Sequence, residues 1–438
     1  MTHQWIATVQ QDLPTSSPDN SSIETRLIHS PATSGEGFGS AAVAVHRAST
    51  TYFASTRALR EQDWRDESRY SYGLHGTPTT LTLAQRIAEL EGGAKALLLP
   101  SGLAAISLVN LAFLNPGDTV LVPLNAYSPT LAMARSMMGR YGITTQIYDP
   151  MAPDTVEWTA SIRLIWLEAA GSITLEFPDL YRWVATARKY GVITVLDNTW
   201  GAGLAFDAFA LGVDMTVHAL TKYPSGGAGV LLGSVVSRDE SLHWTLKHCY
   251  SQLGMGVSPS DAERVLRSLP TLPLRYRQQD QTTRQLADWL QRPERQSELL
   301  AVLHPALPHS IGHEHWKTIC NNHLDNHNVN QDNQNKYYQG KAAGLISLVF
   351  RPEVTLDQLY AFCDALRVFR IGYSWGGPVS LAMPYPWQEI RASVPEGFKG
   401  SSGILRLAIG LEAATDLIND LTQAWPSLSN LGTTGTAP

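Results

Sequence analysis

The middle of the chain alternates short apolar segments with segments of helical spacing, and this alternation constrains the fold more than any other feature. The apolar segments are short, mostly β-branched or Leu-rich, and bounded by Gly, Pro or Asp. They cover residues 94–100, 119–123, 143–149, 163–168, 192–197, 215–219 and 230–237. Helical patterns precede or separate them at 79–91, 101–114 and 180–190. Continuous apolar strands separated by helices predict an α/β fold: a mostly parallel seven-stranded sheet with helices on both faces.

The pattern of apolar and polar residues changes on either side of this region. With roughly 150 residues per domain, 438 residues allow two or three domains. We assign 1–76 to an N-terminal tail and arm, 77–268 to the α/β domain and 269–438 to a smaller C-terminal α+β domain, with a helical run near 282–290. Residues 321–339 have almost no apolar side chains, which predicts a polar surface insertion.

The composition narrows the class of protein and its partners. Charged residues make up only 16% of the chain, against about 25% in an average protein, which leaves many uncharged side chains for a core and for subunit contacts. The net charge is −6 and no basic stripe stands out, so nucleic acid is not an expected partner. Cys249, Cys320 and Cys363 lie far apart, and the first 25 residues contain no Lys or Arg. We therefore expect a cytoplasmic protein without a disulfide framework or a signal peptide.

One segment imitates a membrane span. Residues 96–117 carry no charge over 22 positions, and a transmembrane helix needs about 20 predominantly apolar residues. Pro100, Ser101 and Gly102 interrupt the run early, and Asn110 lies within it. We therefore expect a buried strand, a tight turn and a buried helix here, and no contact with a membrane.

Three candidate functional groups follow strands of the predicted sheet, where open α/β sheets bind their ligands. The turn at 100–103 opens a helix, so its amides suit a phosphate, although many plain turns look alike. Asp197 ends a very apolar strand and is either a turn residue or the partner of a protonated ring nitrogen. Lys222 follows the strand at 215–219 and either reaches solvent or, if desolvated, has a lowered pKa and can form a Schiff base.

Taken together, these three groups fit one cofactor. Pyridoxal 5'-phosphate needs a phosphate cradle, a carboxylate facing its pyridinium nitrogen and a lysine. The chain has the turn at 100–103, then Asp197, then Lys222. The conjunction is much more specific than any of its parts.

Motifs along nearly the whole chain, from about residue 24 to 421, resemble the cystathionine lyase and synthase family of pyridoxal-phosphate enzymes, which has the aspartate-aminotransferase-like fold (fold type I). The matching segments are ETRLIHS, YSYGLHGTPT, AELEGG, PSGLAAIS, NAYSPT, EAAGSITLE, LDNTWGAG, LTKYPSGG, YSWGG and LRLAIGLE. The lysine, LDNTW and YSWGG motifs are the most specific of these.

The resemblance implies a role for each matching cofactor residue. Lys222 would hold the cofactor and then move protons, and Asp197 would pair with the pyridine nitrogen. The phosphate would be bound by the amides of Gly102 and Leu103 and by the Thr221 hydroxyl. Tyr127 would stack on the ring and take part in catalysis, and Tyr72 would reach the phosphate of a neighbouring subunit.

On the substrate side, the resemblance implies that Arg406 grips the α-carboxylate, for which a guanidinium fork is well shaped. Ser374 and Trp375 would line the substrate, Ser374 could steady Lys222, and Tyr250 would lie near the distal end. Each has a structural alternative: the tyrosines as interface or core residues, Arg406 in an ion pair and Trp375 in the core. A site shared between subunits implies at least a dimer, and the resemblance implies a homotetramer.

Several positions depart from the family pattern. Leu74, followed by His75, stands where an arginine usually reaches the phosphate. Ala219 replaces a frequent serine, PSGGAG replaces GHSD after the lysine, and Pro378-Val379 stands where a glutamate is frequent. Either His75 supplies the missing charge or the phosphate site depends on other groups.

The implied reaction is β-elimination of L-cystathionine to homocysteine, pyruvate and ammonia, with other cysteine S-conjugates as further substrates. Trp375 favours it, because γ-acting members (cystathionine γ-synthase, γ-lyase and methionine γ-lyase) commonly carry leucine there. A γ-acting enzyme and a non-catalytic cofactor-binding homologue are the alternatives.

Histidines gather near the insertion, but we expect no metal site. Cys320, His323 and His327 have spacings that zinc sites use, yet there is no second Cys pair. The nearby histidines are His304, His309, His313 and His315. We interpret them as part of a solvated polar loop.

Overall fold

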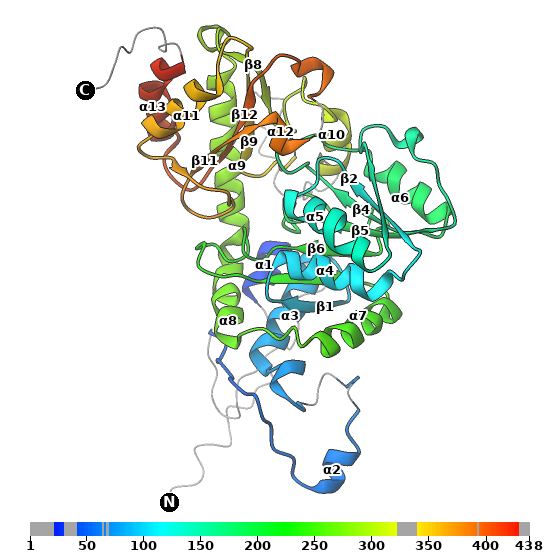
Figure 1. Ribbon diagram of the computed structural model, residues 1–438. Helices are drawn as coiled ribbons and strands as arrows, with labels where there is room; N and C mark the ends of the chain where they lie inside the picture. Colours follow the sequence, from blue (N-terminus) through cyan, green and yellow to red (C-terminus); the bar gives the residue numbers. More distant parts are fainter. Residues whose placement is uncertain are drawn as a thin grey trace, which may run out of the picture.

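The computed structural model describes residues 22–29, 42–63, 65–66, 70–321, 340–391 and 394–428. These ranges form two sheets with helices packed around them, and an arm that carries α2 (Thr56–Arg60) away from the body (Figure 1). The predicted insertion lies outside the described residues except for Asn321. The domain boundaries at 76/77 and 268/269 remain predictions.

The larger sheet has seven strands in the order β1-β7-β6-β5-β4-β2-β3. β7 is antiparallel to both of its neighbours, and all other neighbouring pairs are parallel. This confirms the predicted mostly parallel sheet. The strands are β1 (Lys95–Leu99), β2 (Thr119–Pro123), β3 (Thr144–Tyr148), β4 (Ile162–Glu168), β5 (Ile193–Asp197), β6 (Met215–His218) and β7 (Gly233–Ser237).

Helices cover both faces of this sheet, as the apolar strands predict. In β1, Leu97 and Leu99 pack into one buried cluster, and Ala96 and Leu98 into another on the opposite face. The first cluster contains residues of α4 (Gly102–Phe113), α5 (Ser128–Met133) and α7 (Glu240–Leu253). The second contains residues of α3 (Pro78–Glu91), α6 (Leu180–Lys189) and α8 (Pro259–Ser268).

The uncharged run at 96–117 is a strand, a turn and a helix, as expected. β1 ends at Leu99, and the Ser101 hydroxyl then accepts the amide of Ala104 at 3.0 Å and caps α4. Among the described residues, no helix has both the length and the apolar character that a membrane span requires.

The smaller sheet has the order β10-β11-β12-β9-β8 and is antiparallel except between β10 and β11. In β12, Leu405 and Leu407 pack toward a helical layer, and Arg406 between them points to the opposite face. The elements of this part are β8 (Leu299–Leu303), β9 (Leu345–Phe350), β10 (Arg370–Ile371), β11 (Leu381–Pro386), β12 (Gly403–Ala408), α9 (Leu272–Leu290), α10 (His313–Asn321), α11 (Leu356–Ala365), α12 (Trp387–Ile390) and α13 (Ala414–Ala424).

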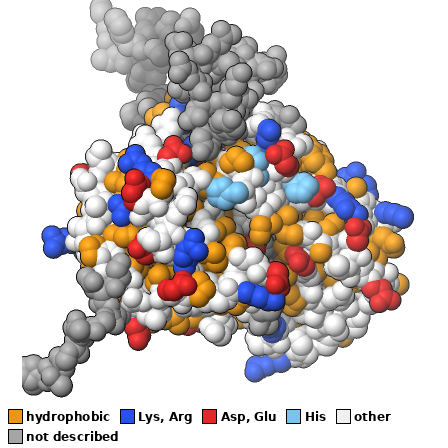
Figure 2. All heavy atoms as spheres, turned by 90° about the horizontal axis from the view of Figure 1, so that it is seen from above, with side chains coloured by type: hydrophobic (Ala, Val, Ile, Leu, Met, Phe, Trp, Pro, Cys, Tyr) orange, Lys and Arg blue, Asp and Glu red, His pale blue; other side chains and the backbone are white. Residues whose placement is uncertain are grey.

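Two elements of this part differ from the sequence prediction. α9 begins at Leu272, well before the run near 282–290, because Pro273 falls in its first turn, where a helix tolerates proline. β8 was not predicted, because its register depends on pairing with the distant β9. α9 stands beside the smaller sheet and extends toward the larger one (Figure 1), and α1 (Ile23–Ile28) completes the helices. On the face shown in Figure 2, acidic and basic side chains are interspersed.

Candidate active site

A cavity of about 560 Å³ opens at the carboxyl ends of the parallel strands. Its walls come from both sheets, since residues after β1, β2, β4, β5 and β6 meet residues of β11, β12 and the loop before β11 there. Nine sequence-predicted site residues line it: Gly102, Leu103, Tyr127, Asp197, Thr221, Lys222, Ser374, Trp375 and Arg406.

The turn after β1 brings amide groups to the cavity. At the start of a helix the first amides have no intrahelical acceptor. The Ser101 hydroxyl takes the amide of Ala104, and the Ser101 carbonyl takes that of Ala105, which leaves the amides of Gly102 and Leu103 for a ligand. A Cβ on Gly102 would lie 2.7 Å from the Cβ of Ala219, so this close approach requires glycine.

Asp197 ends β5 and faces the cavity. Its Oδ1 accepts the amide of Thr199 at 3.0 Å and the Thr199 hydroxyl at 2.6 Å. Burial raises its pKa, and the bonds from Thr199 oppose that shift. No Lys or Arg of the described residues lies within ion-pair distance of this carboxylate, so the turn interpretation accounts for part of its environment and leaves room for a cationic ligand group.

Lys222 points into the cavity rather than to open solvent. Its Nζ donates to the hydroxyl of Ser374 at 2.9 Å and lies 5.1 Å from the centre of the Trp375 ring. Burial and the nearby Arg406 guanidinium lower the pKa of Lys222 from 10.5 to about 8. A substantial fraction of this amine is therefore neutral and nucleophilic near physiological pH.

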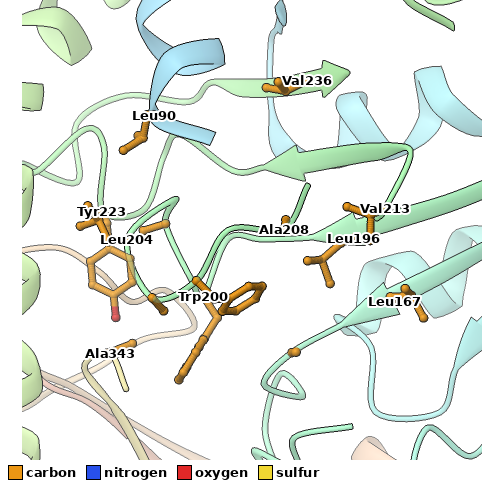
Figure 3. Packing of buried hydrophobic residues seen from close by; sticks show 14 of the residues in the cluster. Leu90, Leu167, Leu196, Trp200, Leu204, Ala208, Val213, Tyr223, Val236 and Ala343 are labelled. Carbon is orange, nitrogen blue, oxygen red and sulfur yellow. The ribbon is translucent and has the colours of Figure 1, made fainter. Parts of the chain in front are cut away.

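The residue after the lysine fixes its loop. Tyr223 is fully buried, and its hydroxyl accepts the amide of Gly344 at 2.9 Å. Its ring is directed toward Ala343 in the core (Figure 3) and lies 5.6 Å from the Trp375 ring. Gly376 has a φ of 78°, and a Cβ there would lie 2.9 Å from the Tyr223 nitrogen. The glycines of the YSWGG motif thus allow its loop to pass directly over the lysine.

Arg406 is a buried cation that lacks an acidic partner among the described residues. Only 4% of it is exposed, and its guanidinium donates to the carbonyls of Ser172 and Tyr373 at 3.1 and 2.7 Å. Burial lowers its pKa. Because an unpaired buried charge is costly, a bound carboxylate would complete this site. The structural alternative, an ion pair, is not what the geometry shows.

The cavity also contains residues to which sequence reasoning gave no role. Glu168 ends β4 beside Asp197, and its Oε2 accepts the amide of Tyr127 at 2.9 Å. Tyr385, on β11, lies under Arg406, with 5.4 Å between the guanidinium carbon and the ring centre. Glu168 could have been found by the argument that singled out Asp197, since both end buried strands. Tyr385 depends on the pairing of β11 with β12, which the sequence does not specify.

Two predicted residues lie outside this cavity within one chain. Tyr72 is 49% exposed on the arm, and a single bridge pairs it with Thr50. Tyr250 lines a separate small cavity, where its hydroxyl donates to the Leu74 carbonyl at 3.2 Å. Burial and the Lys247 ammonium lower the pKa of His75, which favours a neutral imidazole in the single chain.

The histidines near the insertion form no candidate metal centre in the part of the chain that the structure describes. The interpretation as a solvated loop is wrong for His304, His313 and Cys320, which are buried. His323 and His327 lie outside the described residues.

The side chains present fit pyridoxal 5'-phosphate. The free amides of Gly102 and Leu103 can bind a phosphate, and within the described ranges no Lys or Arg forms an ion pair with Asp197. A lysine with a lowered pKa lies in the same cavity. This donor set matches the three requirements of that cofactor.

Comparisons with known proteins agree with this fit. The family model of the Cys/Met metabolism PLP-dependent enzymes matches residues 24–426. The chain is 33% identical over 405 residues to cystathionine beta-lyase MetC of Escherichia coli, covering 91% of this chain and 97% of that one. It is 32% identical over 364 residues to an L-alanine/L-glutamate racemase of Wolbachia pipientis, covering 83% and 84%.

A solved structure of cystathionine gamma synthase from Xanthomonas oryzae, in complex with aminoacrylate and cysteine, superposes with a TM-score of 0.79 at 27% identity, covering 94% of this chain and 99% of that one. These three relatives carry three different activities, so the likeness establishes the family rather than the reaction. The chain belongs to the Cys/Met metabolism family of pyridoxal-phosphate-dependent enzymes.

Proposed function

We propose that this enzyme catalyses β-elimination of L-cystathionine, with water, to homocysteine, pyruvate and ammonia. The supporting observation is Trp375. Its indole packs against Tyr223 and lies under the Nζ of Lys222 at the wall of the cavity. A ring of this size narrows the space beside the lysine, where γ-acting relatives commonly have leucine. The likeness to beta-lyases supports the same assignment.

Each side chain of the cavity has its own role in this reaction. Bound pyridoxal phosphate withdraws electrons from the α-carbon of the substrate. Arg406 binds the α-carboxylate and thereby sets which bond faces Lys222. The Nζ of Lys222, steadied by Ser374, takes the proton from the α-carbon and gives a proton to the departing sulfur. Asp197 would face the ring nitrogen of the bound cofactor and favour a proton there.

The experiment is a product assay with L-cystathionine. We expect pyruvate and homocysteine in equal amounts, and none of either from Lys222→Ala. Production of 2-oxobutyrate and cysteine would instead identify a γ-acting enzyme, which the likeness to the cystathionine gamma synthase supports as the second candidate. Binding of the cofactor without any keto acid from cystathionine or cystine would indicate a non-catalytic homologue.

We further propose that the active form is at least a dimer with shared sites, and a homotetramer by resemblance. The arm that carries Tyr72 projects from the body, and Tyr72 does not reach the cavity of its own chain (Figure 1). Mixing two inactive variants, Lys222→Ala and Tyr72→Ala, and letting the subunits exchange should restore part of the activity. A monomer in solution, or no recovery despite exchange, would contradict shared sites.

A further inference from the structure

Two carboxylates lie side by side where the parallel strands open into the cavity. Glu168 is the last residue of β4 and Asp197 the last of β5, and the two are register partners. Both are partly buried, and both line the cavity. Neighbouring carboxylates repel each other when both are ionised, so a proton on one of the two is favoured unless a cation separates them.

The hydrogen bonds around the pair are unequal. Asp197 accepts two bonds from Thr199 on one oxygen. Glu168 accepts one, from the amide of Tyr127. The phenol of Tyr148 interacts with Glu168 electrostatically but donates its hydroxyl to the Trp166 carbonyl. A carboxylate is stabilised by the donors that it accepts from, so the negative charge is favoured on Asp197.

The charges around the pair are unequal as well. Lys222 interacts with Asp197 and not appreciably with Glu168. Behind Asp197, the fully buried His218 contacts Glu91 through Nδ1 at 2.9 Å, and Glu91 accepts a bond from the side-chain Nδ2 of Asn198 at 2.8 Å. Within this pair, His218 lowers the pKa of Asp197 more than Glu91 raises it. Among the described residues, no cation lies within ion-pair distance of Glu168.

The cavity must also accept anions. Its expected occupants carry a phosphate and an α-carboxylate, and a second ionised carboxylate at its base would repel both. We propose that Glu168 is a positioning residue that works as a neutral carboxylic acid. It fixes the Tyr127 segment through its carbonyl oxygen and confines the negative charge of the cavity base to Asp197. Burial and the Asp197 charge raise the pKa of Glu168 well above its usual range, in agreement with this assignment.

The variants Glu168→Gln and Asp197→Asn separate the two carboxylates. Glutamine mimics the neutral acid and can still accept the Tyr127 amide, so we expect the cofactor Kd of Glu168→Gln to stay within about threefold of the wild type. Asp197→Asn removes the charge that faces the ring nitrogen, and its cofactor Kd should rise about 100-fold. Circular dichroism and thermal melts of both variants control for folding.

Infrared spectroscopy of the cofactor-free protein at pH 7.5 observes the proton directly. We expect a carboxylic-acid carbonyl band that Glu168→Gln removes and Asp197→Asn leaves in place. Incorporating ¹³C-labelled glutamate should shift the same band in the unmodified sequence, so the result does not depend on a variant that folds. Absence of the band, or a Glu168→Gln protein that binds cofactor as weakly as Asp197→Asn, would overturn the proposal.

The pH dependence of cofactor binding gives a third readout. A neutral acid with a raised pKa ionises as pH rises, and the wild-type affinity should then fall relative to that of Glu168→Gln. Lys222 titrates equally in both proteins, so their difference isolates Glu168. Identical profiles combined with a missing infrared band would show that Glu168 is ionised throughout. The inference rests on the proposed function only through the cofactor site, and its readouts need no substrate, so failure here is distinct from failure of the product assay.

Discussion

Two anion-binding groups face the same cavity from different sheets, and they are built on opposite principles. The larger sheet provides the amides of Gly102 and Leu103 at the start of α4, which are neutral donors. The smaller sheet provides Arg406, a buried cation on β12 without an acidic partner in the described chain. The first group depends on shape, because only glycine allows the close approach. The second depends on charge and on a planar fork.

Removing the positive charge of Arg406 should have the largest effect on activity. Arg406→Met keeps much of the chain length but leaves no donor for the substrate carboxylate, so kcat/KM for cystathionine should fall by about 1,000-fold. Arg406→Lys keeps the charge without the fork and should fall less. The cofactor Kd should change little in both, as measured by fluorescence titration. A comparable loss of cofactor affinity would show that the two groups are not separate.

Changing the shape of the helix start at Gly102 should have the second largest effect, on cofactor affinity. In Gly102→Ala the new Cβ would lie 2.7 Å from the Cβ of Ala219, so the helix start must move away. Overpacking of this kind typically costs about 1–3 kcal/mol, which predicts a cofactor Kd raised about 10- to 100-fold. KM at saturating cofactor should stay near the wild-type value.

The double variant Gly102→Ala/Ala219→Gly is the matched control, because it removes the opposing methyl group. It should recover most of the lost affinity. Failure to recover would mean that Gly102 is needed for its backbone conformation rather than for the space beside Ala219.

How far the sequence predicts this cavity depends on how local each signal is. The strands and the residues at their ends are local features, because burial on both faces leaves continuous apolar runs and a terminal Asp197 or Lys222 stands out against them. Glu168 has the same local signal, since it ends the apolar segment 163–168, and it is also the first residue of the EAAGSITLE motif.

The wall from the smaller sheet is less predictable, because it depends on contacts between distant segments. Tyr385 reaches the cavity through the pairing of β11 with β12, in which Met383 is opposite Arg406. The arm with Tyr72 lies outside the cavity of its own chain, so a role for Tyr72 in the cofactor site requires a second subunit.

Lys222 lies between the two anion-binding groups, and its lowered pKa can be tested by the pH dependence of cofactor uptake. Its pKa is lowered to about 8, so the amine is increasingly protonated below that pH and loses its nucleophilicity. The rate at which cofactor-free protein takes up pyridoxal phosphate, followed by absorbance, should rise about tenfold per pH unit below pH 8 and level off above it. A plateau reached only near the ordinary lysine pKa of 10.5 would indicate a solvated side chain.

The smallest effect is expected at Thr221, which tests whether the amides of α4 bind the phosphate largely unaided. Its hydroxyl donates to the Leu232 carbonyl at 3.2 Å and accepts the Leu232 amide at 3.0 Å, so it is already engaged in one chain. Serine keeps these bonds, and Thr221→Ser should bind cofactor like the wild type. Thr221→Val removes both of these bonds and any bond from the hydroxyl to the phosphate, and loss of that last bond, about 1 kcal/mol, predicts a Kd raised about fivefold. A loss at Thr221→Val as large as that of Gly102→Ala would mean that the hydroxyl contributes as much to phosphate binding as the start of the helix does.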